Sequence, residues 1–253
     1  MKITFLGTGT SQGIPVIGSR HQVCLSSDPK DKRLRSSVLL EWADSSYVID
    51  CGPDFRQQML AYGTDHLDGI LFTHYHADHT AGLDDVRPYS QRFGEIAFYC
   101  DKGVAENLRE RFQYIFATEN RYAGAPKVSL NEISLDPFEL KGKKIIPIEV
   151  MHGNLKILGF RIDHLAYITD AKTIAQTEMA KLKNLDVLII NALRIEPHPT
   201  HFNLEEALDF IENIKPKKAY ITHISHRLGF HRQVSAGLPP NVFLAYDGLV
   251  LDV

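Results

Sequence analysis

The chain has 253 residues, of which 44% are hydrophobic and 23% charged, and its formal net charge is −3. This composition is ordinary for a globular protein and allows one large domain or two small ones. No apolar stretch is long enough to cross a membrane, and the near-neutral charge argues against a broad nucleic-acid-binding surface.

The chain opens with a predicted strand over residues 2–7, which does not have the pattern of a cleavable signal peptide. The three cysteines, Cys24, Cys51 and Cys100, show no paired spacing, so we expect no disulfide and a cytoplasmic location. The glycine-rich segment 7–13 precedes no helical pattern. We therefore interpret it as a tight turn near the active site rather than as a phosphate-binding or dinucleotide-binding loop.

A basic run at residues 30–35 follows. Such a run usually forms a solvated loop, which is our interpretation, with contact of Arg33 or Arg35 to a phosphate as the alternative. Residues 36–42 and 46–51 are predicted to form a hairpin.

A helix is predicted over residues 54–61, with Pro53 close to its first turn. Asp50 and Asp54 lie near its start. Two interpretations of these carboxylates stay open: they orient metal ligands from behind, or they cap the helix.

A dense cluster of metal-binding side chains comes directly after the apolar run 69–72. His74, His76, Asp78 and His79 lie within six positions. The apolar run predicts a short buried strand, and its alternation would place His74 and His76 on one side. Imidazole nitrogens and a carboxylate oxygen are donors that suit a divalent metal ion. Polar loops also gather histidines by chance, but this density favours a metal site.

Two metal ions fit this motif better than one, because a single tetrahedral zinc site takes three protein ligands and a water. His74 and His76 can serve one ion while Asp78 and His79 serve the other. Each ion then needs ligands from elsewhere. Three later residues follow or end strand-like runs and can supply them: His152, Asp170 and His223.

The remaining chain alternates strands with a few helices. Helices are predicted at 101–113, about 173–182 and about 203–213. Three interpretations of the aromatic segment 114–127 stay open: a substrate lid, an anchored loop or a dimer contact. Two strand-rich halves predict two sheets packed face to face, with helices outside, in a single domain over residues 1–253. Further strands are predicted at 95–100, 129–134, 138–140, 143–150, 156–163, 165–169, 186–191, 218–221 and in two short runs within 242–252.

The motif at 74–79, with its three downstream partners, resembles the metallo-β-lactamase superfamily across essentially the whole chain. The resemblance implies an α+β fold, an αββα sandwich of two mixed sheets with helices on the outer faces, and a dinuclear site at one edge. It also implies an assignment of ligands: His74, His76 and His152 on one ion, Asp78, His79 and His223 on the other, and Asp170 as the bridge.

Within that superfamily the chain is most similar to the PhnP type, the phosphoribosyl cyclic phosphate phosphodiesterases. The likeness rests on the segments 7–10 and 222–226 and on His201 before a helix. That type carries Cys-x-Cys-x-x-Cys, which with a late histidine binds a structural zinc ion. Here Ser19, His21 and Cys24 stand at the three positions. We predict a third, structural zinc ion on three ligands, with an ordinary metal-free loop as the equal alternative. The three ligands are His21, Cys24 and His226.

The leading interpretation is a metal-dependent hydrolase, a phosphodiesterase that cleaves a small cyclic-nucleotide-like or phosphoribosyl cyclic phosphodiester. Alternatives are hydrolysis of thioesters or lactones in the manner of glyoxalase II, tRNA 3′ processing, and a non-catalytic binding module. We expect a small-molecule phosphodiester as partner, no extended nucleic-acid surface, no membrane contact and a homodimer. Nitrogen and oxygen ligands favour two zinc ions, with manganese or iron as alternatives.

Two residues are expected to act on the substrate itself. His201 has the pKa range of a general acid and is expected to protonate the leaving group. Asp78 is expected to combine a catalytic role with metal binding. His198 is the rival to His201, but prolines on both sides favour a structural role.

Overall fold

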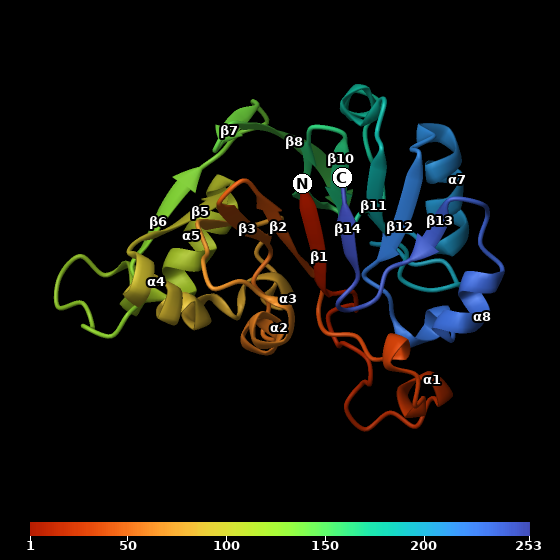
Figure 1. Ribbon diagram of the computed structural model, residues 1–253, viewed down its shortest axis with the longest axis horizontal. Helices are drawn as coiled ribbons and strands as arrows, with labels where there is room; N and C mark the ends of the chain where they lie inside the picture. The colour runs from red at the N-terminus through yellow and green to blue at the C-terminus, as the bar shows by residue number, and fades with distance from the viewer.

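Two seven-stranded β-sheets pack face to face in the computed structural model, which describes residues 1–253 (Figure 1). The strand order is β14-β1-β2-β3-β4-β5-β6 in the first sheet and β13-β12-β11-β10-β9-β8-β7 in the second. The first sheet contains β1 (Lys2–Gly7), β2 (Ser37–Trp42), β3 (Ser45–Ile49), β4 (Gly69–Leu71), β5 (Ile96–Cys100), β6 (Val128–Glu132) and β14 (Val250–Asp252). The second contains β7 (Phe138–Leu140), β8 (Lys143–His152), β9 (Leu155–Ile162), β10 (Leu165–Ile168), β11 (Val187–Asn191), β12 (Lys218–Thr222) and β13 (Val242–Leu244).

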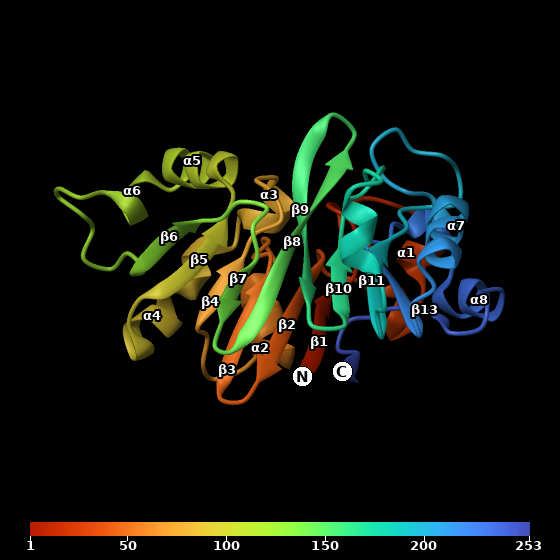
Figure 2. The same cartoon turned by 90° about the horizontal axis from the view of Figure 1, so that it is seen from above.

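Helices cover the outer face of each sheet (Figure 2). Helices within residues 55–116 lie on the first sheet, and those of the C-terminal half lie on the second, together with the short helix at residues 22–25. The longer helices are α2 (Phe55–Tyr62), α4 (Arg87–Phe93), α5 (Lys102–Arg111), α7 (Leu204–Ile214) and α8 (His231–Ala236). The short ones are α1 (Gln22–Leu25), α3 (Ala77–Thr80) and α6 (Gln113–Phe116), with 3₁₀ turns at η1 (Pro29–Asp31), η2 (Leu83–Val86), η3 (Glu178–Leu182) and η4 (His226–Leu228).

Three apolar cores separate these four layers. The central core joins inward residues of both sheets, such as Phe5 and Leu40 from the first and Phe160 and Tyr167 from the second. The other two lie beneath the helices of the first sheet and of the second. Strand residues alternate between the cores because successive side chains of a strand point to opposite faces. The architecture is the αββα sandwich expected for an α+β chain of this kind.

The predicted helix at about 173–182 is wrong over its first half. The backbone at residues 172–173 pairs with the end of β8 instead. Lys172 N donates to Met151 O, and Met151 N donates to Thr173 O. Because this bridge holds the chain extended beside β8, only the short turn η3 forms. The predicted strands, the hairpin and the other helices are present within a few residues of their expected ends.

The sequence reading missed five helices: α1, α3, α4, α6 and α8. Each has seven residues or fewer, too short to show a helical repeat of apolar residues. Helix α4 carries Pro88 in its first turn, where a missing N–H costs nothing.

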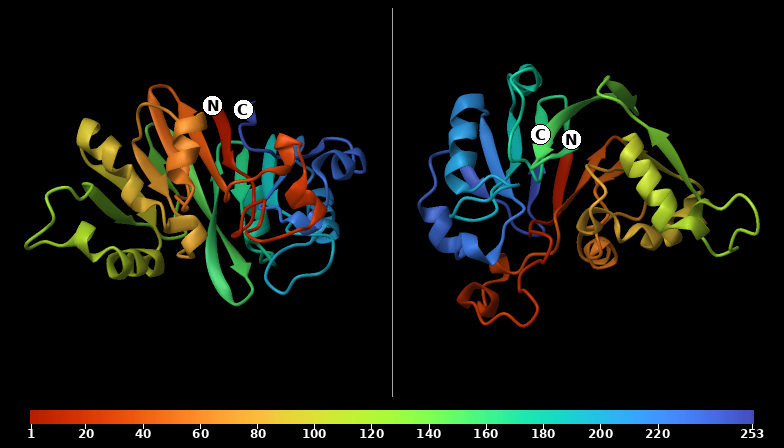
Figure 3. Two further views of the ribbon diagram at one scale, coloured as in Figure 1. Left: turned by 90° about the horizontal axis from the view of Figure 1, so that it is seen from below. Right: turned by 180° about the vertical axis from the view of Figure 1, so that it is seen from behind.

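Loops that follow parallel strands of both sheets meet at one edge of the sandwich (Figure 3). Strands β3, β4 and β5 run parallel in the first sheet, and β10, β11 and β12 run parallel in the second. The tight turn after β1 joins the two sheets there, since Thr10 N donates to Ile224 O and Ile224 N to Thr8 O. No helix is long and apolar enough to span a membrane.

Candidate metal centre

The histidine motif begins just beyond β4 and continues into α3. Leu71 ends β4, so His74 and His76 lie in the loop between strand and helix. Their rings contact edge to face with centroids 4.6 Å apart, on one side as expected. His74 and His79 are buried, whereas His76 and Asp78 are partly exposed.

The structure brings the predicted ligands of the first ion together. Ligand atoms of His74, His76 and His152 all lie within 4.8 Å of one another. His152 is the last residue of β8, in the second sheet. This set therefore joins the two sheets.

The predicted ligands of the second ion also form one group. Ligand atoms of Asp78, His79 and His223 lie within 4.8 Å of one another. His223 follows β12 directly, so it also comes from the second sheet. Its Nε2 atom lies 3.8 Å from Oδ2 of Asp78.

Asp170 lies between the two sets. Its Oδ2 atom is 3.3 Å from Nε2 of His79, and its Oδ1 atom is 3.1 Å from Nε2 of His223. It also forms a group of potential ligands with His74 and His79. This is the place that a bridging carboxylate would occupy.

Asp50 organises the centre from behind. This fully buried carboxylate accepts hydrogen bonds from the backbone N–H of Thr73 (2.8 Å), from Thr73 Oγ1 (2.8 Å) and from Nδ1 of His79 (2.7 Å). Nδ1 of His74 lies 2.9 Å from Thr73 Oγ1. Of the two open interpretations, Asp50 thus takes the orienting one. Asp54 instead pairs with Arg35 and makes no side-chain cap bond.

Each of three histidines has one ring nitrogen tied to the protein. Nδ1 of His79 contacts Asp50, Nδ1 of His74 contacts Thr73, and Nδ1 of His152 lies 2.9 Å from Thr200 O. A partner at Nδ1 fixes the orientation of the ring and turns Nε2 toward the centre, where Nε2 of His74 also lies 3.0 Å from Nδ1 of His76. The donor set therefore fits the metal ions that the motif implies. Nε2 atoms of His79 and His223 are buried and make no well-aligned hydrogen bond, although oxygens of Asp170 lie 3.3 and 3.1 Å away, as such a site requires.

Opposite charges at the centre shift the pKa values of its histidines and carboxylates. Burial lowers the pKa of His79, but the nearby carboxylates of Asp78, Asp50 and Asp170 outweigh it and raise that pKa well above the usual value. Burial alone would raise the pKa of Asp170, but His223 and three other histidines hold it well below its usual range. Asp170 is thus ionised at neutral pH, as a metal-bridging carboxylate must be.

Three residues of the centre have a strained backbone. Asp50, Asp170 and His223 have φ angles of 65°, 56° and 53°, in the left-handed region that residues other than glycine rarely adopt. Each comes just after a strand of the sandwich. Such strain costs about 1–3 kcal/mol per residue and persists where the surroundings over-determine it, commonly at functional sites.

His201 reaches the centre and His198 stays beside it. Nδ1 of His201 lies 3.6 Å from Oδ1 of Asp170, and the His201 ring packs 5.0 Å from that of His223. Burial, then the charge of His223, lowers the pKa of His201 to about 3. Asn203 caps α7 in a capping box with Glu206, which fixes the chain just after His201. Nδ1 of His198 is engaged with Thr200, as a structural residue would be.

The predicted structural zinc ligands are only partly assembled. The rings of His21 and His226 lie 4.9 Å apart, but Cys24 belongs to none of the groups of three potential ligands. Nδ1 of His21 accepts from Val23 N, and Cys24 Sγ accepts from Val16 N. The third zinc ion therefore stays a prediction.

Sequence reasoning missed Thr73 and Thr200, which hold the Nδ1 atoms of His74 and His152. Thr73 directly precedes the motif, so its place in the sequence is a signal for this role. Thr200 acts through its backbone carbonyl, so no sequence signal marks it.

A model of the beta-lactamase superfamily domain matches residues 46–224, which is more than half of the chain. This chain belongs to the metallo-β-lactamase superfamily. A crystal structure described as a new diphosphatase from the PhnP family is 40% identical, covers 100% of this chain and 97% of that chain, and has a TM-score of 0.93. The chain is thus a PhnP-like member of the superfamily. Its fold and this neighbour support a hydrolase, and the fold implies divalent-metal binding.

Two curated relatives have other names. An octanoyltransferase of Porphyromonas gingivalis is 41% identical over 252 residues, which are 98% of this chain and 51% of that protein. A ribonuclease Z of Haloarcula marismortui is 26% identical over 156 residues, which are 60% of this chain and 44% of that protein. The chain spans about half the length of these relatives or less.

Proposed function

We propose that this protein is a dinuclear metal-dependent phosphodiesterase acting on a small phosphodiester. The observation that carries the proposal is the pair of ligand groups with a buried carboxylate between them. In the proposed assignment His74, His76 and His152 hold one ion, Asp78, His79 and His223 hold the other, and Asp170 bridges. When bound, the two ions would activate water and neutralise charge on the phosphoryl oxygens.

Residues of the chain supply the rest of the chemistry. Asp50 and Thr73 keep the ligand rings oriented, and the strained turn at Asp170 aims its carboxylate between the two sets. His201 faces the same space and is proposed to give a proton to the departing oxygen. With a pKa lowered to about 3 it is neutral in the free protein, and the negative charge of a bound phosphate would favour its protonated form.

The PhnP-family neighbour supports phosphorus chemistry, since its description names a diphosphatase. A second candidate is hydrolysis of an acyl thioester, which the relative named octanoyltransferase favours. The relatives named ribonuclease Z make tRNA 3′ processing a third candidate. The near-neutral net charge of −3 does not favour it.

The test is a substrate panel on purified protein whose metal content has been measured. The panel holds bis-nitrophenyl phosphate, a small diphosphate diester, an octanoyl thioester, a lactone and a tRNA with a 3′ trailer, each assayed with zinc, manganese and iron restored. We expect turnover of the phosphorus esters with two metal ions per chain, and its loss in Asp170→Ala. Turnover of the thioester alone, or of no phosphorus ester, would overturn the proposal.

A further inference from the structure

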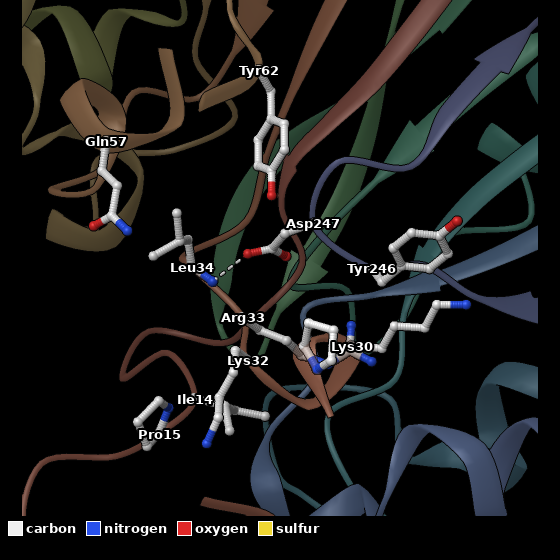
Figure 4. Close-up of a pocket in the computed structure, with 11 residues that line it drawn as sticks. Ile14, Pro15, Lys30, Lys32, Arg33, Leu34, Gln57, Tyr62, Tyr246 and Asp247 are labelled. Atoms are coloured by element: carbon white, nitrogen blue, oxygen red, sulfur yellow. Dashed lines mark hydrogen bonds between the residues drawn. The ribbon is translucent and has the colours of Figure 1, made fainter. Parts of the chain in front are cut away.

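A cavity lies apart from the metal centre, between α2 and the early basic run (Figure 4). Its volume is about 530 Å³, within the range of small-molecule sites. Its walls come from α2, from residues 14–15, 29–30 and 32–34, and from the chain at Tyr246–Asp247. None of the proposed metal ligands lines it.

Aromatic and apolar side chains form much of its wall. Figure 4 shows Tyr62 reaching down from α2 toward Asp247, with Leu34 below and Tyr246 to one side. Tyr62 is 40% exposed, so its ring is open to a ligand. The backbone at Gly248 passes against this ring so closely that an added Cβ atom would lie 2.7 Å from it. Two tyrosine rings beside an apolar wall suit a planar ring system.

Positive charge gathers at the same place. Lys30, Lys32 and Arg33 line the cavity, and none of them takes part in an ion pair. Lys30 Nζ lies 4.3 Å from the centre of the Tyr246 ring, and Lys32 Nζ donates to the carbonyl of Cys24. The basic run is thus not a solvated loop throughout, because Arg33 is only 3% exposed.

The Arg33 guanidinium is held in place by neutral acceptors. It donates to Thr8 Oγ1 at 2.7 Å and to Ala245 O at 2.5 Å, and it lies 3.0 Å from Nδ1 of His231. Burial, then the charge of Arg33, lowers the pKa of His231 to about 4, so this histidine is neutral at pH 7. The cation is thus buried without a direct carboxylate partner. Burial lowers the pKa of Arg33 to about 10, and the charges of Asp247, Asp31 and Asp28 offset only part of that cost.

Asp247 is the one acid in the wall, and its oxygens are already engaged. Oδ1 accepts from Thr8 Oγ1 and Oδ2 from Leu34 N, both at 2.7 Å. Three cations and one occupied carboxylate give the wall itself an excess of positive charge, although Asp28 and Asp31, outside the wall, also act on Arg33. An anion would satisfy that excess.

We propose that this cavity binds an anion that carries a planar ring, of the size of a nucleoside monophosphate. The ring packs against Tyr62 and Leu34, and the anionic group meets Lys30 and the field of Arg33. A molecule bound there lies beside Asp247, which accepts a hydrogen bond from Thr8 Oγ1. The carbonyl of Thr8 in turn accepts from Ile224 N, next to the proposed metal ligand His223. The site is thereby linked to the metal centre by one turn of chain, without sharing a residue with it.

Calorimetric titration with AMP tests the site, with adenosine and inorganic phosphate as the ring-only and anion-only probes. We expect saturable binding of AMP, and at least about tenfold weaker binding of each simpler probe, because each lacks one half of the recognition. Lys30→Gln and Tyr62→Ala are expected to weaken AMP binding at least about tenfold. Both side chains are on the surface, so the fold is kept, which thermal melts check.

Asp170→Ala separates this cavity from the metal centre. It is expected to keep AMP binding while losing hydrolysis, and Lys215→Gln, a lysine outside the cavity, is expected to change nothing. Loss of AMP binding in Asp170→Ala with retention in Lys30→Gln would place the nucleotide at the metal centre and overturn the proposal. Absence of saturable binding, or equal binding of phosphate, would overturn it too. Neither result would bear on the proposed hydrolysis.

Discussion

At the scale of single residues, Asp50 supports proposed ligands of both ions from behind the centre. It accepts from both groups of Thr73 and from His79, and through Thr73 it also reaches His74. A carboxylate behind a histidine ligand raises the basicity of the ring and fixes its direction. One buried acid thus orients a ligand of each proposed ion.

We therefore expect Asp50→Asn to weaken metal binding about 10–100-fold, because the amide removes the charge and one acceptor from the network. Competition with a chromogenic chelator measures the affinity. Asp54→Asn is the matched control, since Asp54 pairs with Arg35 instead of a histidine. Equal losses in the two variants would assign the effect to general destabilisation.

His201 carries the second prediction at this scale. His201→Ala is expected to slow hydrolysis of a diester with a sugar-like alkoxide leaving group by roughly 10²–10⁴-fold, and that of a nitrophenyl diester far less. The alkoxide needs a proton and the nitrophenolate does not. Rates on both substrates, with metal content measured alongside, check this. His198→Ala serves as control and should leave both rates nearly unchanged. A lost metal ion in His201→Ala would instead make His201 a ligand, because its group with His152 and Asp170 also has the spacing for one.

At the scale of elements, close backbone contact between the end of β3 and α3 positions the motif. An added Cβ atom at Gly52 would lie 2.0 Å from the carbonyl oxygen of Asp78, and one at Gly82 would lie 2.1 Å from that of Gly52. Cys51 N donates to His79 O at 2.7 Å, and Gly82 N donates to Cys51 O at 2.9 Å. The short helix that carries two proposed ligands is thus held by backbone contacts that admit only glycine.

Gly52→Ala is expected to lower the free energy of unfolding by about 1–3 kcal/mol and to weaken metal binding, because α3 must move away from the new methyl group. Urea unfolding and chelator competition measure the two effects. Gly103→Ala in α5 is the control: its Cβ atom has a nearest contact of 3.4 Å, so it should be neutral or stabilising by up to about 1 kcal/mol. Unchanged stability in Gly52→Ala would show that α3 is free to shift.

Sequence alone predicts the strands, and the motif residues that the structure gathers at the centre, for a physical reason. Both are local: a buried strand shows as an apolar run, and the motif at 74–79 is contiguous. The helix at 173–182 fails because Thr173 pairs with β8, a contact set by tertiary structure. The orienting role of Asp50 and the buried position of Arg33 are equally non-local, since partners such as His79 and Ala245 lie far along the chain.

At the scale of the whole molecule, the proposed ions would cross-link the two sheets. The first sheet supplies the motif after β4, and the second supplies His152, Asp170 and His223 from β8, β10 and β12. The turn at Thr10 and the bond from Leu158 N to Thr73 O also join the sheets at this edge. Metal binding should therefore act on the stability of the entire sandwich. The homodimer and the role of residues 114–127 stay predictions.

We expect zinc to raise the melting temperature of the metal-free protein by about 5–10 °C for each ion at a free concentration 100 times its dissociation constant. Such saturation contributes about 2.7 kcal/mol per ion, and a chain of this size gains about 2–4 °C per kcal/mol. Calorimetry with and without a chelator measures the shift, and one cooperative transition would support the predicted single domain over residues 1–253. His152→Ala removes the second sheet's ligand to the first ion, so its shift should fall by about half. A melting temperature that ignores zinc in the wild type, or two transitions of which zinc moves only one, would show that the ions do not join the sheets.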